Sequence, residues 1–220
     1  MATASFYGVR RPGSPRLECL WVVPGVAGWL SFWQPIGVPV AQNDPLSRFG
    51  AVPLFVLTST DMTDGAPLSA PQYGTASDGR NISPQLEWSG FPADTKSFAV
   101  TMYDPDAPTG SGFWHWAVFN LPAGCAALPA DAGAPGGRLL PTDAVTLPNE
   151  GRQSAFVGAG PPAGTGTHRY QFIVHAVDVP RLDIDPDSTP AVLGFNLHFH
   201  TLARAVLEAT GVHGGAALNP

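Results

Sequence analysis

Glycine and proline restrict the fold of this chain more than any other feature. The sequence holds 25 glycines and 24 prolines among its 220 residues, and they are spread along its length. Proline removes a backbone donor and breaks helices, and glycine favours turns, so few long helices can form. A hydrophobic fraction of 44% still allows a core, and the length suits a single domain. We therefore expect many turns and loops between short elements, in an all-β or α+β fold.

Charge and cysteine content narrow the classes of function. The formal net charge is −6, Lys96 is the single lysine, and no run of basic residues occurs. Nucleic-acid binding needs clustered basic side chains, so the sequence predicts none. The two cysteines, Cys19 and Cys125, are too few for a metal cluster or a disulfide framework. We expect free thiols in the cytoplasm, without a metal or cofactor.

The first 50 residues differ from the remainder of the chain. Three arginines between residues 10 and 16 precede an apolar stretch over 20–33 that contains three tryptophans. Pro24 and Gly28 interrupt this stretch, which is too short and broken to span a membrane. We interpret residues 1–50 as a poorly ordered leader. The alternative is an export signal ending near residue 41, which would make the protein exported rather than cytoplasmic.

From residue 51 the sequence alternates between strand-like runs and turns. Residues 168–177 alternate, with Tyr170 and Phe172 on one face and Gln171 on the other. Thr189-Pro190 is a typical helix start, and we expect a helix from there past residue 207, with Gly211 as its stop. The domain of residues 51–212 should be an antiparallel β core with a C-terminal helix, and 213–220 a flexible tail. Predicted strands lie at 52–59, 86–88, 96–103, 113–121 and 168–177, with a long loop over 123–147.

Three segments carry polar residues that could form a site. Asp104-Pro-Asp-Ala-Pro108 is a rigid bend at the end of a strand; it could equally be a solvated turn, and no third ligand suggests a metal. His115 lies among aromatic residues, which is typical either of a buried core histidine or of a pocket wall. The glycine-rich run 158–166 can form an anion-accepting nest or simply a hairpin loop. His168 and Tyr170 follow it on one face of a strand.

Together these segments resemble the phosphatidylethanolamine-binding protein family, and more closely its bacterial, Raf kinase inhibitor-like branch. Further matching stretches are Ser83-Pro-Gln-Leu-Glu-Trp88, Gly166-Thr-His-Arg-Tyr170 and Leu193-Gly-Phe-Asn-Leu-His-Phe-His200. The resemblance extends from residue 52 to residue 207. It implies an antiparallel β sandwich with short helices at its margins, and one pocket for phosphate or a phosphorylated lipid head group. It also implies a homodimer and a cis bond at Ala107–Pro108. The residues that would line the pocket are Asp104, Asp106, His115, Gly160, His168 and Tyr170.

Imidazole and phenol groups suit such a ligand, because protonated histidine and tyrosine donate to phosphate oxygens. We read Asp104 and Asp106 as groups that orient these donors. Phe156 stands where many members of the family have a tyrosine, so one hydroxyl is missing. Some members inhibit kinases or serine proteases, and a protein partner is expected on that ground.

Two further functions stay open. A structural or partner-binding protein could retain the pocket as a vestige. A hydrolase would need a nucleophile, and Ser111, the nearest serine, lies in Gly-Ser-Gly rather than in a nucleophile elbow. We therefore expect a binding protein and not an enzyme.

Overall fold

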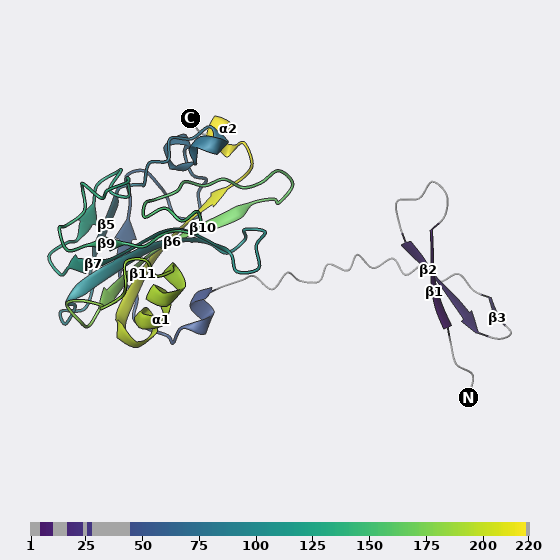
Figure 1. The fold of residues 1–220 in the computed structure, drawn as a ribbon, viewed down its shortest axis with the longest axis horizontal. Coiled ribbons are helices and arrows are strands. Elements are labelled where there is room, and N and C mark those ends of the chain that lie inside the picture. The colour runs from purple at the N-terminus through teal and green to yellow at the C-terminus, as the bar shows by residue number, and fades with distance from the viewer. Residues whose placement is uncertain (1–4, 11–16, 24–25, 28–44, 219–220) are drawn as a thin grey trace. The chain divides into compact units, whose positions relative to one another are not determined.

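The computed structural model describes residues 5–10, 17–23, 26–27 and 45–218 (Figure 1). The first unit contains β1 (Ser5–Arg10), β2 (Leu17–Val23) and β3 (Val26–Ala27), which form an antiparallel sheet in the order β1-β2-β3. The segment 28–44 of the predicted leader, which includes the candidate cleavage site near residue 41, lies outside the described residues.

The second unit is a two-layered antiparallel sandwich, as predicted. One sheet has the order β11-β10-β6-β7-β9 and the other β4-β5-β8. Its strands are β4 (Val56–Thr58), β5 (Leu86–Ser89), β6 (Ser97–Asp104), β7 (Phe113–Pro122), β8 (Ala127–Leu128), β9 (Val145–Thr146), β10 (His168–Val177) and β11 (Thr201–Gly211). Its helices are η1 (Pro45–Arg48), η2 (Ala70–Gln72), η3 (Thr75–Ser77), α1 (Pro190–His200) and α2 (Gly215–Leu218).

Alternation along the central strands builds the main core between the sheets. Phe172 of β10 stands opposite Met102 of β6, and both are fully buried against the smaller sheet. Trp88 of β5 meets Phe98 of β6 edge to face, with ring centroids 5.4 Å apart. Because successive strand residues point to opposite faces, Gln171, Ile173 and His175 lie on the reverse side, as the alternation predicts.

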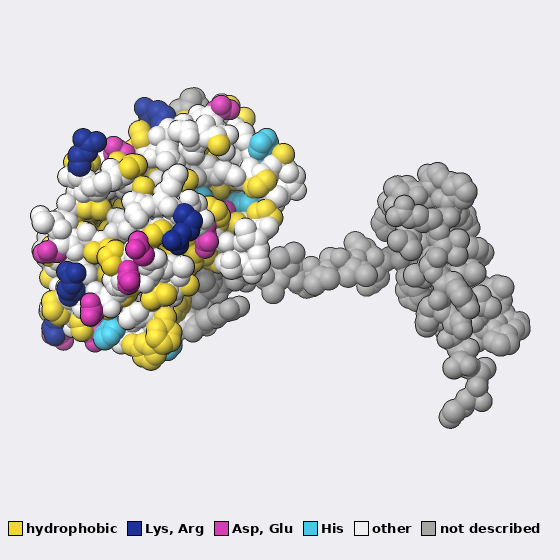
Figure 2. Space-filling view, in the orientation of Figure 1, with side chains coloured by type: hydrophobic (Ala, Val, Ile, Leu, Met, Phe, Trp, Pro, Cys, Tyr) yellow, Lys and Arg dark blue, Asp and Glu magenta, His cyan; other side chains and the backbone are white. Residues whose placement is uncertain are grey.

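Helix α1 covers part of that reverse face (Figure 1). Leu193 and Leu197 pack against Ala117, Phe119 and Val177 of the five-stranded sheet in a second, smaller core. The outward side of α1 leaves apolar side chains in solvent, and hydrophobic atoms are visible on the surface there (Figure 2).

The predicted C-terminal helix is half as long as expected, and the second half of that prediction is wrong. The helix starts at Pro190 but ends at His200, where Thr201 turns to extended backbone and donates to the Leu197 carbonyl. Residues 201–211 form β11, which pairs with β10. Alanine, leucine and glutamate favour helices in isolation. Here the buried alternation of Ala203, Ala205 and Leu207 on the edge of a sheet overrides that propensity.

Smaller corrections concern the chain between the central strands. The first predicted strand is reduced to β4, because Pro53 to Phe55 instead exchange backbone hydrogen bonds with Arg204. The loop over 123–147 contains the two-residue strands β8 and β9. The tail expected to be flexible at 213–220 contains α2, with Gly215 and Ala216 buried.

The Ala107–Pro108 bond is trans, since no cis peptide occurs in the part of the chain that the structure describes. In the same part, none of the helices has the length and apolar character needed to cross a membrane.

Candidate functional site

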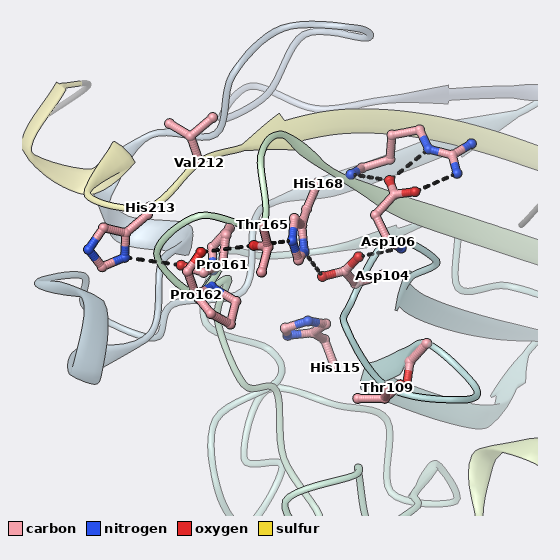
Figure 3. A network of polar contacts seen from close by, with 12 residues as sticks. Asp104, Asp106, Thr109, His115, Pro161, Pro162, Thr165, His168, Val212 and His213 are labelled. Carbon is pink, nitrogen blue, oxygen red and sulfur yellow. Dashed lines mark hydrogen bonds and ion pairs between the residues drawn. The ribbon is translucent and has the colours of Figure 1, made fainter. Parts of the chain in front are cut away.

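Neighbouring strands bring the predicted residues to one end of the five-stranded sheet. Asp104 is the last residue of β6, His168 the first of β10, and His115 the third of β7. These strands are adjacent and antiparallel in the order β10-β6-β7, so the end of β6 lies beside the starts of the other two. Figure 3 shows Asp104, His115 and His168 next to one another. The sequence thus predicted correctly that the three segments meet.

A buried carboxylate–imidazole pair forms the centre of the site. Oδ2 of Asp104 lies 2.7 Å from Nδ1 of His168, and both residues are at most 3% exposed. Oδ1 of Asp104 accepts a 2.8 Å hydrogen bond from the Asp106 amide, which fixes the carboxylate across the aspartate bend. Asp104 therefore orients His168, as predicted.

The second nitrogen of His168 is also engaged. Nε2 lies 2.7 Å from Oγ1 of Thr165, and that hydroxyl donates to the Pro162 carbonyl at 2.8 Å. Protein groups therefore occupy both ring nitrogens of His168.

Asp106 forms a second ion pair at the edge of the site. Its carboxylate accepts hydrogen bonds from the Arg169 amide at 2.9 Å and from Nε and Nη2 of the same guanidinium at 2.8 Å each. Burial disfavours ionisation of Asp106, but the hydrogen bonds from Arg169 outweigh it and hold the pKa of Asp106 below its usual range. Asp106 thus anchors the start of strand β10. Its negative charge is paired with Arg169 and is not directed at a ligand.

His115 is held in one tautomer. Its Nδ1 lies 2.8 Å from the Val157 carbonyl, which can only accept, so Nδ1 carries the proton and Nε2 the lone pair. Burial lowers the pKa of His115 to about 4, although the backbone of Val157 and Gly158 and the Asp104 carboxylate oppose the shift. At neutral pH the ring is uncharged, and Nε2 makes no hydrogen bond of standard geometry with the residues at 45–218.

Tyr170 contributes an unsatisfied donor. Its side chain is fully buried and stands edge-on to the His115 ring, with centroids 5.3 Å apart. The hydroxyl has no hydrogen-bond partner in the described part of the chain. Burial raises the pKa of Tyr170 far above its ordinary value, so the group stays protonated, while the nearby Gly160 amide opposes this rise. Buried polar groups are almost always paired, so an orphaned hydroxyl indicates a place for a ligand or water.

The glycine loop places the Gly160 amide beside Tyr170. Gly158 donates to Oδ1 of Asn81 at 2.6 Å, and Ala159 exchanges backbone hydrogen bonds with Gln72 and Gly74. The next amide, that of Gly160, is directed at the Tyr170 hydroxyl, and Gly160 is exposed. The loop therefore places one backbone donor at the mouth of the site.

Sequence reasoning missed the residues that complete this network. Thr165 and Arg169 lie inside the recognised motifs. Nothing in those motifs indicates that Thr165 contacts His168 or that Arg169 contacts Asp106. His213, in the C-terminal segment, lies 3.2 Å from the Pro161 carbonyl through Nδ1. Figure 3 shows the resulting chain of contacts from the C-terminal segment through the proline pair to His168.

A cavity lies elsewhere, on the reverse face of the five-stranded sheet. It contains about 360 Å³ of empty space, part of which is open to solvent. The lining is mainly apolar and includes Phe49, Trp114, Ile173 and Leu197. None of the six predicted site residues lines it. Within the described ranges, no group of histidine, cysteine or acidic side chains has the arrangement to hold a metal ion.

Comparison with known proteins identifies the family. The family model described as phosphatidylethanolamine-binding protein matches residues 58–212. The protein YbhB of Escherichia coli K12 is 48% identical over 155 residues, which cover 70% of this chain and 97% of YbhB. YbcL of the same organism is 46% identical over 161 residues, covering 72% of this chain and 87% of YbcL.

Solved structures agree with the sequence matches. The crystal structure of E. coli YbcL, described as a member of the mammalian PEBP family, has a TM-score of 0.69 at 44% identity and covers 71% of this chain and 97% of its own. A homologue from Chlamydia trachomatis, CT736, has a TM-score of 0.60 at 28% identity, covering 71% and 96%. The chain belongs to the phosphatidylethanolamine-binding protein family.

Proposed function

We propose that the protein binds phosphate or a phosphorylated small molecule, such as a lipid head group, at the site formed by Asp104, Asp106, His115, Gly160, His168 and Tyr170. The observation that carries this proposal is the buried hydroxyl of Tyr170, which makes no hydrogen bond of standard geometry in the described part of the chain. A buried hydroxyl donor without a protein acceptor is suited to an anion oxygen. The family name and the name of CT736, a phosphatidylethanolamine-binding protein homologue, support the same ligand class.

The site residues have separate roles in this proposal. The Tyr170 hydroxyl donates to the anion, and the Gly160 amide lies beside it. Asp104 holds the ring of His168, and Asp106 holds the start of β10 through Arg169. The sequence alone treated both histidines as donors to the ligand. In the structure, only His115 has a ring nitrogen left for a ligand.

Titration followed by NMR tests the proposal. Phosphate and phosphoethanolamine are added at pH 6 and pH 8 while histidine and tyrosine resonances are recorded. We expect saturable shifts of His115 and Tyr170, lost in His115→Ala and weakened in Tyr170→Phe. His198→Ala is the control, because His198 is an exposed residue of α1. Absence of any shift at millimolar ligand in the wild-type protein would refute the proposal.

One geometric observation favours a second function. Asp104, His168 and Thr165 are joined by two contacts of 2.7 Å, the spacing of an acid–base–nucleophile triad. For catalysis the Thr165 proton would have to point at His168. The 2.8 Å contact with Pro162 assigns it to that carbonyl instead, which supports binding rather than catalysis. Covalent labelling of Thr165 by a fluorophosphonate probe would favour a hydrolase over a binding protein.

Inhibition of a kinase or protease and formation of a homodimer stay predictions. The outward side of α1 is where self-association would be favoured, because Phe195 and Phe199 are 67% and 63% exposed and contact each other edge to face.

A cytoplasmic location also stays a prediction. It is compatible with the free thiol of Cys125, whereas LppC of Mycobacterium tuberculosis, 35% identical over 156 residues, is named as a lipoprotein.

A further inference from the structure

The tautomer of His115 depends on a carbonyl in a segment without regular secondary structure. Nδ1 of His115 lies 2.8 Å from the Val157 carbonyl, and the Val157 amide donates to the His115 carbonyl at 3.0 Å. Val157 belongs to no helix or strand, so β7 alone does not determine where its carbonyl points. The proton of a neutral imidazole lies on the nitrogen that has an acceptor. The groups that hold Val157 therefore decide which nitrogen His115 offers to a ligand.

The side chain of Asn81 holds this segment on both sides of Val157. Its Nδ2 donates to the Phe156 carbonyl at 3.3 Å, and its Oδ1 accepts from the Gly158 amide at 2.6 Å. These partners lie 75 and 77 positions further along the sequence. An amide side chain suits this task because it combines a donor and an acceptor in one plane.

Asn81 is itself held in place by its backbone. Its φ is 59°, in the left-handed region, where asparagine is one of the favoured non-glycine residues. Its amide donates to the Tyr73 carbonyl at 2.8 Å, and the next amide, of Ile82, donates to the Pro71 carbonyl at 2.9 Å. The partner segment packs so closely that a Cβ at Gly158 would lie 2.4 Å from the backbone of Tyr73. Asn81 thus has a fixed position from which to hold the Val157 carbonyl.

We infer that Asn81 is a positioning residue of the ligand site: it holds the Val157 carbonyl, keeps the proton of His115 on Nδ1, and leaves Nε2 as an acceptor for a donor group of the ligand. This inference rests on the proposed function and adds a residue to its site. Phosphoethanolamine has such a donor in its ammonium group, and protonated phosphate has one in its P–OH. The other tautomer would place a ring N–H against these donors.

Nitrogen NMR of the histidine rings tests this role without a ligand. The full chain is examined at pH 7, where His115 is neutral because burial lowers its pKa to about 4. In the wild-type protein we expect Nδ1 of His115 to be protonated and Nε2 to be bare. Asn81→Gly removes the side-chain contacts and still permits a positive φ, so both ring resonances should move toward the averaged positions of a tautomer mixture. The control is Asp131→Gly, since Asp131 is an exposed residue with φ 68°, and it should leave the ring resonances unchanged.

The affinity for phosphoethanolamine is measured on the same samples. We expect it to fall at least about twofold in Asn81→Gly, because two equally populated tautomers halve the fraction of molecules that can bind. Asn81→Asp keeps the acceptor for the Gly158 amide and loses the donor to the Phe156 carbonyl, so its ring resonances and its affinity should lie between those of wild type and Asn81→Gly. Urea unfolding of each variant identifies a purely structural role, which would lower stability and leave the ring resonances of the folded protein in place.

The outcomes separate this inference from the proposed function. A wild-type His115 protonated on Nε2, or unchanged ring resonances in Asn81→Gly, would overturn the inference and leave the proposed site in place. A tautomer mixture with undiminished affinity would overturn the link between Asn81 and the ligand. Absence of phosphoethanolamine binding to the wild-type protein would overturn the proposed function, whereas the ring resonances would still decide whether Asn81 sets the tautomer. Should Asn81→Gly fail to fold, the wild-type tautomer and Asn81→Asp decide the question.

Discussion

Replacing Asp104 by asparagine separates the orienting role of this carboxylate from its charge. The change preserves the shape of the side chain, and its amide oxygen can still accept from the Asp106 amide. The contact with Nδ1 of His168 then involves a neutral amide instead of a carboxylate. The variant thus replaces a charge-assisted hydrogen bond in a buried site by a neutral one.

The cost in stability follows from that exchange. A hydrogen bond between charged groups contributes about 1.5–3 kcal/mol and a neutral one about 1 kcal/mol. We therefore expect Asp104→Asn to lower the free energy of unfolding by about 1–2 kcal/mol. A larger loss, of about 3–5 kcal/mol, is typical when one partner of a buried pair keeps its charge. A loss of that size in Asp104→Asn would show that the variant leaves a buried charge without its partner.

Urea denaturation followed by tryptophan fluorescence measures this difference, with Asp183→Asn as the control because Asp183 is an exposed carboxylate. Phosphate affinity should fall in Asp104→Asn, since the neutral amide holds the His168 ring less firmly beside the site. Tighter phosphate binding in this variant would show that the carboxylate repels the ligand more than it orients His168, and would refute the reasoning.

Two predictions concern backbone packing and pH. In Gly158→Ala the new Cβ would lie 2.4 Å from the backbone of Tyr73, so we expect the free energy of unfolding to fall by more than about 2 kcal/mol. The control is Gly110→Ala, which has no atom within 4 Å of its new Cβ. In thermal melts followed by circular dichroism, this control should unfold within a few degrees of wild type. Burial lowers the pKa of His115 to about 4 and of His175 to about 3, so below pH 6.5 the unfolded state binds protons that the native state does not. Stability should therefore fall by about 1.4 kcal/mol per pH unit for each histidine between pH 6.5 and 4, and a urea midpoint that is constant over this range would contradict it.

The sandwich and its site were predictable to the extent that they depend on local pattern. Strand alternation placed Tyr170 and Phe172 on one face of β10 and Gln171 on the other, and the motif residues Asp104 and His168 lie in contact. The helix at 190–211 was half wrong because the same residues suit a helix locally and an edge strand in context. Only the pairing of β11 with β10, which joins residues 24 to 43 positions apart across α1, decides between them.

What the sequence could not supply is the position of protons and the occupancy of hydrogen-bonding groups. Two histidines in similar motifs appear equivalent as donors. The structure distinguishes them, because Thr165 and Asp104 occupy both nitrogens of His168, whereas the Val157 carbonyl occupies only Nδ1 of His115. These partners are a loop threonine and a backbone carbonyl, for which the sequence provides no signal.

This difference changes what the site can recognise. If both histidines were free and protonated, the site would carry a net positive charge and would favour dianions, sulfate included. With His168 held by Asp104 and Thr165 and with His115 neutral, the site offers the Tyr170 hydroxyl as a donor and Nε2 of His115 as an acceptor. Such a site recognises a ligand by matched donors and acceptors, since a polar group that a ligand leaves unpaired in a buried site costs free energy. A motif that fixes which residues are present therefore leaves open which phosphorylated ligand is bound, and the partners of the two imidazoles decide it.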